Sequence, residues 1–125
     1  MKYILVALKA ELPEHNLDPA EYKVWYTGVG KVNATMWATM ACIQHDCDTV
    51  INYGTAGGFN KELAGQLLHI GNIRQRDMDA RPQAELGVTP FDTSGFAGDI
   101  KISNSAYSVS SGDNFVKAQP ELESD

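Results

Sequence analysis

Three glycine-rich turns are the places in this sequence where a small ligand would most readily bind. Each turn follows a segment whose composition predicts a β-strand. In parallel α/β sheets, ligands bind beyond the carboxyl ends of the strands, and glycine lets a ligand approach the backbone. Three such turns on one sheet edge predict a small-molecule site, with tight turns that hold no ligand as the alternative. The turns span residues 28–30, 54–58 and 112–113.

Motifs for nucleotide cofactors and for a serine nucleophile are incomplete or missing. Residues 28–33 carry the first two glycines of the dinucleotide fingerprint, but Asn33 stands at the third position. The acidic residue expected about 20 positions later would be Asp48, which opens its predicted strand instead of ending it. The sequence has neither a Gly-x4-Gly-Lys-Ser/Thr phosphate loop nor a Gly-x-Ser-x-Gly elbow. We therefore expect no cofactor.

Two groups of side chains have the chemistry of metal ligands without a metal site's pattern. Cys42, His45 and Cys47 are close in sequence, but a structural zinc site needs a fourth ligand and none is nearby. Asp77 and Asp79 begin a loop, where two carboxylates are more typical of solvated or capping groups. We therefore expect no metal ion.

Charge and length exclude several classes of protein. The chain has 125 residues, with 16 acidic and 10 basic side chains and a net charge of −6. This balance argues against nucleic acid and against an anionic membrane surface as partners. The apolar run at 3–8 is too short for a signal peptide, and no run of about 18 apolar residues is present. We expect a single cytoplasmic domain over residues 1–125, with reduced cysteines.

A βαβ unit is predicted to position the first two turns. Residues 3–8 predict a strand buried on both faces. Over residues 23–53 a strand, a glycine turn, a helix and a strand follow one another, which predicts a partly parallel sheet. The helix is expected at about 31–45. Its apolar residues are spaced by 4, 4 and 3 positions and predict one stripe that packs into the core. The stripe consists of Val32, Met36, Met40 and Ile43.

The second half of the chain is predicted to contribute strands and one long loop. Residues 67–76 predict a strand region with a bend or bulge at Gly71, and residues 107–111 predict another strand. Between them, residues 77–100 are rich in Gly, Pro, Asp and Thr and predict a long loop, which in a compact domain is usually functional or mobile.

Four segments occur in an order and at intervals that are informative together. They are Ala-Leu-Lys-Ala-Glu at 7–11, Gly-Val-Gly-Lys-Val-Asn-Ala at 28–34, Asn-Tyr-Gly-Thr-Ala-Gly-Gly at 52–58 and Ser-Ser-Gly-Asp-Asn-Phe-Val at 110–116. Together they resemble the nucleoside phosphorylase and nucleosidase superfamily, most closely its methylthioadenosine/S-adenosylhomocysteine nucleosidases. Residues 76–79 resemble the family's Asp-rich strand end. The resemblance implies an α/β fold of three-layer type, with a mixed, partly parallel β-sheet and flanking helices.

The resemblance also implies a reaction, the hydrolysis of the N-glycosidic bond of a purine nucleoside. By resemblance, Glu11 is the acid that positions and activates the attacking water. Thr55, Ala56 and Gly57 form the turn beside the ribose and the water. A carboxylate suits this place, because positive charge develops on the sugar in the transition state.

The fourth segment implies how the purine is bound. By resemblance, Phe115 lies against the purine face, and the backbone of Val116 meets the base edge. The family further implies a homodimer or larger homo-oligomer. Residues 80–84 differ from the apolar residues that relatives place near the substrate's sulfur substituent, so the 5′-substituent stays open.

Two departures from the family bear on activity. Phosphorylases place an arginine just before the Gly-Thr/Ser turn, whereas residues 51–53 here are Ile-Asn-Tyr, which favours water over phosphate as the nucleophile. The family's ribose-binding Met-Glu-Ala run and proton-donating Ser-Asp run are also missing, and the sequence ends at 121–125 where the first is due. We therefore expect a fold incomplete at the C-terminus and little or no hydrolysis by these 125 residues alone. The alternatives are a non-catalytic purine-binding relative and an interaction protein with a vestigial pocket.

Overall fold

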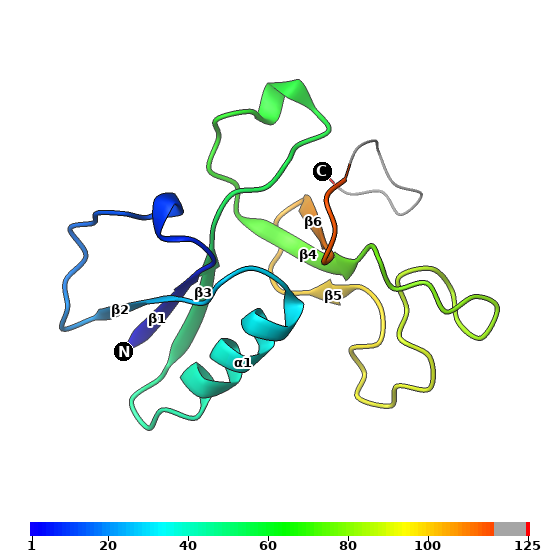
Figure 1. The fold of residues 1–125 in the computed structure, drawn as a ribbon, viewed down its shortest axis with the longest axis horizontal. Helices are drawn as coiled ribbons and strands as arrows, with labels where there is room; N and C mark the ends of the chain where they lie inside the picture. The colour runs from blue at the N-terminus through cyan, green and yellow to red at the C-terminus, as the bar shows by residue number, and fades with distance from the viewer. Residues whose placement is uncertain (117–124) are drawn as a thin grey trace. The chain divides into compact units, whose positions relative to one another are not determined.

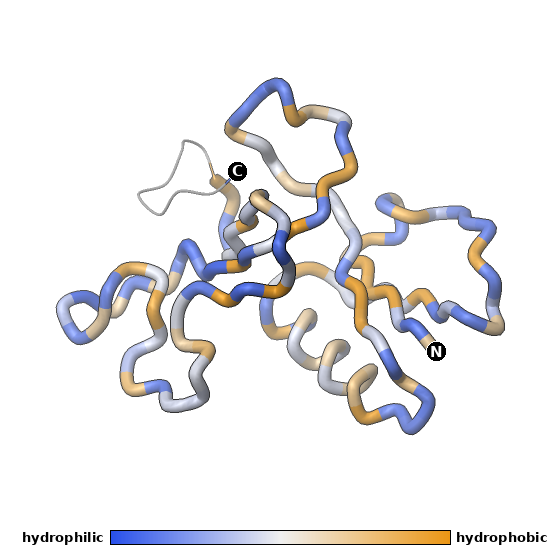
Figure 2. Tube along the Cα trace, turned by 180° about the vertical axis from the view of Figure 1, so that it is seen from behind, coloured by the Kyte–Doolittle hydropathy of each residue, from blue (hydrophilic) through white to orange (hydrophobic). Residues whose placement is uncertain are grey.

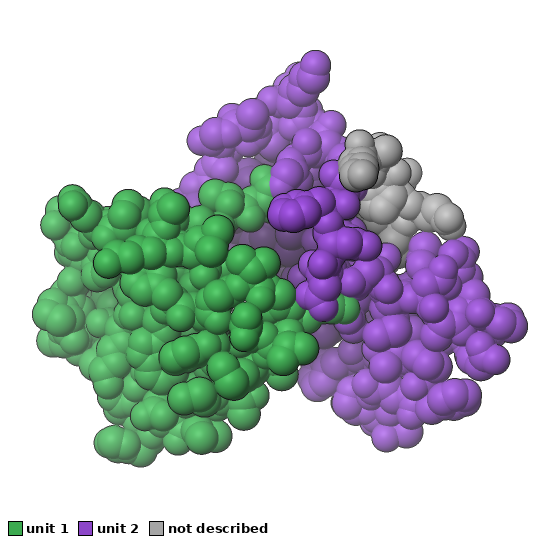
Figure 3. Space-filling model, viewed as in Figure 1, with its two compact units in different colours: residues 1–56 green, residues 57–125 purple. Residues whose placement is uncertain are grey.

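The computed structural model describes residues 1–116 and 125, which form parts of two compact units. Unit 1 comprises residues 1–56 and unit 2 comprises residues 57–125 (Figure 3). The assignment of residues 1–125 to a single domain stays a prediction. Most of the acidic end of the sequence, at 117–124, lies outside the described residues.

Unit 1 is built on three parallel strands with the first strand of the chain in the centre (Figure 1). The sheet order is β2-β1-β3, with β1 at Lys2–Val6, β2 at Tyr22–Tyr26 and β3 at Thr49–Tyr53. Helix α1, Lys31–Cys42, connects β2 to β3, and a short 3-10 helix, η1, spans Lys9–Glu11. The predicted βαβ unit is therefore confirmed. The parallel arrangement brings the carboxyl ends of all three strands to one edge.

The buried core of unit 1 is centred on β1. Tyr3 to Val6 are all buried, so this part of the predicted strand is covered on both faces. The strand ends at Val6, however, and Leu8, which the prediction included, is exposed. Tyr3 and Leu5 pack with Ala41 of α1. The Trp25 ring meets Tyr3 edge to face at 4.9 Å and Trp37 at 5.6 Å between ring centroids. Aromatic contacts thus join the helix to the sheet.

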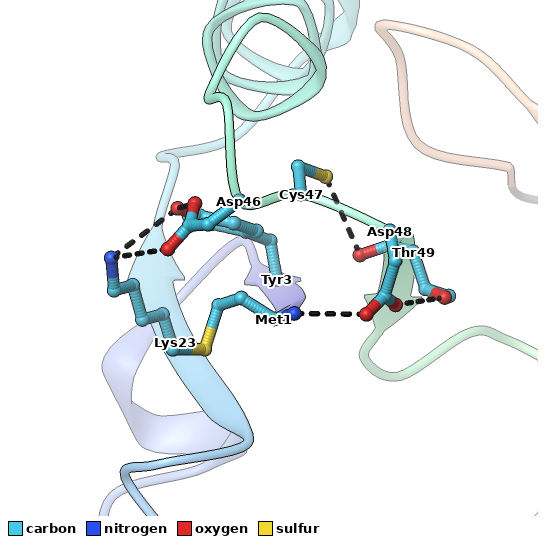
Figure 4. Close-up of polar contacts among 7 residues, drawn as sticks. All are labelled: Met1, Tyr3, Lys23, Asp46, Cys47, Asp48 and Thr49. Atoms are coloured by element: carbon cyan, nitrogen blue, oxygen red, sulfur yellow. Dashed lines mark hydrogen bonds and ion pairs between the residues drawn. The ribbon is translucent and has the colours of Figure 1, made fainter.

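A polar network closes the amino end of the same sheet (Figure 4). The Tyr3 hydroxyl donates to Asp46 Oδ1 at 2.6 Å, and Lys23 Nζ contacts Asp46 Oδ2 at 3.4 Å. The terminal ammonium of Met1 pairs with Asp48 Oδ2 at 2.8 Å. The hydrogen bond from Tyr3 is the largest of the influences that lower the pKa of Asp46. The network therefore ties β1 and β2 to the loop that leads into β3.

The predicted apolar stripe of α1 is not its buried face. Val32 is 81% exposed and Ile43 74% exposed, and Met36 and Met40 are exposed as well. The helix instead turns Trp37, Ala38 and Ala41 inward, with Ala41 fully buried. Small side chains let the helix approach the sheet, and the Trp37–Trp25 contact fixes its rotation. Figure 2 shows that most of the helix is weakly hydrophobic, so its pattern does not single out one face strongly.

Unit 2 contains a second three-stranded sheet, in the order β5-β4-β6. Strand β4, Ile70–Gln75, pairs in parallel with β6, Tyr107–Ser111, and antiparallel with β5, Ile100–Lys101. A second 3-10 helix, η2, spans Lys61–Leu63. The sheet of unit 1 is thus parallel and that of unit 2 mixed, which agrees with the predicted α/β class, and the described residues hold one α-helix.

Two predictions about unit 2 meet different outcomes. The bulge at Gly71 is confirmed by a register shift between Ile70 and Asn72, and a Cβ there would lie 1.9 Å from the Ser105 carbonyl oxygen. In contrast, the turn at 112–113 ends β6 and so belongs to this second sheet. The expectation that all three glycine turns share one sheet edge is wrong. Within the described part of the chain, no helix has the length and apolar character needed to cross a membrane.

Candidate functional site

The candidate site lies at the carboxyl edge of the parallel sheet in unit 1. The β1–β2 ladder continues past both strands, with hydrogen bonds from Thr27 N to the Val6 carbonyl at 2.9 Å and from Gly28 N to the Ala7 carbonyl at 3.0 Å. The segment after β1 then turns into η1, which ends at Glu11. The turn after β3 supplies residues 54–56. Three loops therefore converge at this edge.

The carboxylate of Glu11 is held by hydrogen bonds from two of these loops. Its Oε1 accepts from the Thr55 backbone N–H at 3.0 Å and from the Thr55 hydroxyl at 2.7 Å. Its Oε2 accepts from the Leu8 backbone N–H at 3.0 Å. Gly54 lies so close that a Cβ added there would be 3.3 Å from Oε1. The carboxylate is thus fixed in position and orientation.

These hydrogen bonds favour the ionised form of Glu11 over the protonated form. The hydroxyl of Thr55 lowers the pKa of Glu11 most strongly, partial burial opposes that change, and the two backbone N–H groups lower the pKa further. Glu11 is therefore a carboxylate at neutral pH. A lowered pKa makes a weak base, so this carboxylate is better suited to orienting a polar group and stabilising positive charge than to removing a proton outright.

The turn after β2 is stiffened by its own contacts. Gly28 and Gly30 have φ values of 80° and 100°, which favour glycine. The Asn33 amide donates to the Val29 carbonyl at 2.8 Å, and a Cβ at position 28 would lie 3.0 Å from Asn33 Nδ2. Asn33, which broke the dinucleotide fingerprint, therefore has a structural use in this turn.

The structure distributes the predicted site residues over both units. Glu11 and Thr55 lie together in unit 1, and Ala56 follows Thr55 directly. Gly57 is exposed in unit 2. Phe115, 97% exposed, and Val116, 41% exposed, also belong to unit 2.

Sequence reasoning missed two contributors to the Glu11 site. The backbone N–H of Leu8 binds Oε2, and Gly54 leaves room for the carboxylate. Glu11 is the third residue of η1, and a glutamate at this position often accepts a hydrogen bond from the backbone N–H of the residue just before the helix. That pattern could have indicated the Leu8 contact. Nothing in the spacing indicated the close approach at Gly54.

Among the described residues, no group of three or more His, Cys, Asp or Glu side chains is arranged to hold a metal ion. The two aspartates considered for a metal have different partners. Asp79 pairs with Arg81 at 2.7 Å, and this guanidinium lowers its pKa to about 2. Asp77 accepts a hydrogen bond from the Asp113 backbone N–H at 2.9 Å.

Comparison with known proteins gives a consistent family signal. The model of the phosphorylase superfamily matches residues 20–118. Three similar curated proteins are 5'-methylthioadenosine/S-adenosylhomocysteine nucleosidases. That of Chromohalobacter salexigens is 36% identical over 66 residues, which are 52% of this chain and 28% of the relative. That of Shewanella halifaxensis is 32% identical over 94 residues, 74% of this chain and 41% of the relative. That of Bacillus subtilis is 35% identical over 78 residues, 61% of this chain and 34% of the relative.

The extent of these matches limits what they carry. The matched part of the chain spans well under half the length of each of these three relatives. The family match begins after Glu11, so the part assigned to Glu11 depends on its motif and its geometry. No solved structure matched the chain.

Proposed function

The chain belongs to the phosphorylase superfamily, and from this premise we propose that the intact protein is a nucleosidase. Its reaction is the hydrolysis of the N-glycosidic bond of a purine nucleoside of the methylthioadenosine or S-adenosylhomocysteine type. The observation that carries the proposal is the Glu11 carboxylate, fixed in position by two hydrogen bonds from Thr55 at the carboxyl edge of a parallel sheet. The curated relatives named above, all nucleosidases by name, support the same class of reaction.

Counting the hydrogen bonds at Glu11 suggests how it acts. A carboxylate has about two acceptor sites on each oxygen. Thr55 occupies both sites on Oε1 and Leu8 occupies one on Oε2, which leaves one site on Oε2 for an O–H of the attacking water. The water oxygen bonds to C1′ as the bond from C1′ to the base nitrogen breaks and its electron pair leaves with the purine. The water loses one proton to solvent and the purine nitrogen takes up one, so the products are the free sugar and the neutral purine. The negative charge of Glu11 stabilises the oxocarbenium-like sugar.

Water is the preferred nucleophile because this edge lacks the phosphorylase arginine. The end of β3 carries Ile51, Asn52 and Tyr53, whereas a phosphorylase has an arginine here that binds phosphate through two parallel hydrogen bonds. Thr55, Ala56 and Gly57 are proposed to line the ribose and the water, and Phe115 and Val116 to bind the purine. A homodimer or larger homo-oligomer in the cytoplasm completes the proposal, from the resemblance to the family.

The experiment is Glu11→Gln in the intact protein, with adenine release from methylthioadenosine followed by chromatography and inosine as a second substrate. Glutamine keeps the size but loses the charge, so turnover is expected to fall by about 10²-fold or more. Glu14→Gln, an exposed glutamate nearby, is the matched control and stays within a few-fold. Activity of Glu11→Gln within a few-fold of the unmodified protein would remove Glu11 from this assignment.

A second measurement separates the alternatives. The 125-residue chain is expected to show little or no hydrolysis, because the family's proton donor is not in its sequence. Tight adenine binding by the intact protein without any turnover would instead support a non-catalytic purine-binding relative. If the intact protein shows neither binding nor turnover, the remaining alternative is an interaction protein with a vestigial pocket.

A further inference from the structure

Two side chains from the end of β4 hold the turn that follows β6. The parallel ladder pairs Gln75 with Ser111, and one more rung follows, from Arg76 N to the Ser111 carbonyl at 3.0 Å. Beyond this rung the two chains are linked by side chains. All of these residues lie in unit 2.

Arg76 and Asp77, which follow β4, make these links to Asp113 and Asn114, which follow β6. The Arg76 guanidinium donates through Nη1 to Asn114 Oδ1 and through Nη2 to the Asn114 carbonyl. Asp77 Oδ2 accepts from the Asp113 backbone N–H at 2.9 Å. A guanidinium presents two parallel donors in a fixed plane, so it fixes the orientation of Asn114 as well as its position.

The contacts of Arg76 and Asp77 with the turn need the space that Gly112 leaves by having no side chain. A Cβ at this position would lie 2.6 Å from Arg76 Nη1 and 3.0 Å from Asp77 Cγ. Both of those side chains are engaged with the turn, so they could yield only by giving up their hydrogen bonds. The sequence Ser-Gly-Asp-Asn after β6 and Arg-Asp after β4 therefore works as one structural unit.

Arg76 holds the peptide group just before the proposed purine-binding residues. The Asn114 carbonyl held by Arg76 belongs to the peptide bond that leads into Phe115, whose side chain is 97% exposed. Phe115 is almost fully exposed, so within residues 1–116 it is the turn, and not packing of this side chain, that holds the backbone here. A binding residue held in place before the ligand arrives spares the ligand the cost of ordering it.

We propose that Arg76 and Asp77 are positioning residues that set the direction of the 115–116 backbone for the purine base. The proposal rests on the function proposed above, because it takes the purine as the ligand of Phe115 and Val116. Neither Arg76 nor Asp77 is assigned any contact with the substrate. Their loss is therefore expected to weaken base binding more than it slows the chemical step.

The test compares Arg76→Lys with Arg74→Lys in the intact protein. Lysine keeps the charge at position 76 but cannot donate two parallel hydrogen bonds to Asn114. The Kd for adenine and the KM for methylthioadenosine are expected to rise about tenfold, the factor that accompanies loss of one such hydrogen bond, with kcat within about twofold. Arg74→Lys, inside β4 and two positions earlier, keeps an ion pair with Asp99 and leaves both constants within about twofold of the unmodified protein.

A second pair of variants decides the matter if Arg76→Lys does not fold. Asp77→Asn keeps an oxygen that accepts from the Asp113 N–H, whereas Asp77→Ala removes it. The asparagine variant is expected to bind adenine like the unmodified protein and the alanine variant to bind several-fold more weakly. Added ethylguanidinium should restore adenine binding to Arg76→Ala, which a general loss of stability would not allow.

Two failures are distinguishable. If the unmodified protein binds adenine and neither Arg76→Lys nor Asp77→Ala changes Kd or KM, the positioning proposal is overturned and the proposed function stands. A change in kcat alone would also overturn it, because Arg76 would then act on the chemical step. If the unmodified intact protein neither binds adenine nor releases it, the proposed function fails and this proposal fails with it.

Discussion

Thr55 donates two hydrogen bonds to one oxygen of Glu11, from its backbone and from its hydroxyl, although the two residues are 44 positions apart. This pair joins the loop after the central strand β1 to the loop after β3. It also lowers the pKa of the carboxyl group, because the hydroxyl of Thr55 is the largest influence on the pKa of Glu11.

Replacing Thr55 by valine is expected to raise the pKa of Glu11 toward its ordinary value. Valine has nearly the same shape but no hydroxyl, so one of the two donors to Oε1 is lost. The pKa can be followed by NMR of the Glu11 carboxyl carbon as pH is lowered. Thr55→Ser is the matched control, because it keeps the hydroxyl, and should leave the pKa lowered. Equal titration curves for both variants would show that the hydroxyl does not hold the carboxylate.

A Gly54→Ala change is expected to disturb Glu11, whereas Gly58→Ala is not. Neither glycine has a positive φ, so alanine alone should stabilise the fold by about 0.4–1 kcal/mol through the unfolded chain. At position 54 the new Cβ would sit 3.3 Å from Oε1, whereas at position 58 its nearest neighbour is 3.7 Å away. Urea unfolding should show the gain for Gly58→Ala only, and the Glu11 pKa should rise for Gly54→Ala only. A full gain at both positions would contradict the close approach.

Much of this arrangement follows from local sequence patterns, and the remainder depends on contacts that such patterns do not encode. The buried run in β1, the strand at 107–111 and the bulge at Gly71 were each predicted, because burial and glycine leave local marks in a sequence. The buried face of α1 was predicted wrongly, because spacing cannot weigh a methionine stripe against small residues anchored by Trp37. Glu11 and Thr55 were placed in one site through family resemblance and not through spacing. The Arg76 contacts with Asn114 were missed, because 38 residues separate the partners.

The Tyr3 hydroxyl is expected to contribute more to the stability of the fold at neutral pH than in acid. Its hydrogen bond is the main cause that lowers the pKa of Asp46, so Asp46 adds stability above its ordinary pKa of about 3.9 that is lost as pH falls through the lowered value. Tyr3→Phe should therefore lower the melting temperature at pH 7, by several degrees, and the deficit should shrink as the pH approaches 3. Thermal melts at several pH values measure this. Tyr22→Phe makes the same change in a half-buried tyrosine of β2, and a deficit of the same size and pH dependence there would refute the assignment to Asp46.

Shortening a buried side chain of β1 is expected to lower the free energy of unfolding much more than shortening an exposed side chain of α1. Leu5→Ala removes a buried side chain from the cluster with Tyr3 and Ala41, and should cost about 2–5 kcal/mol of unfolding free energy. Val32→Ala, on the exposed face of α1, should stay within about 0.5 kcal/mol. Chemical denaturation of the two variants makes the comparison. A large loss from Val32→Ala would show that its helix face is covered in solution.

The central place of β1 in its sheet has a consequence for how the protein is made. Strand β1 leaves the ribosome first, but its two partners in register come later, beginning at Tyr22 and Thr49. At a synthesis rate of about 5–20 residues per second, its second edge finds no partner for several seconds. For that interval the most apolar segment of unit 1 is an open template for other nascent chains. The yield of folded protein should therefore depend on translation speed and on chaperones that bind Lys2–Val6.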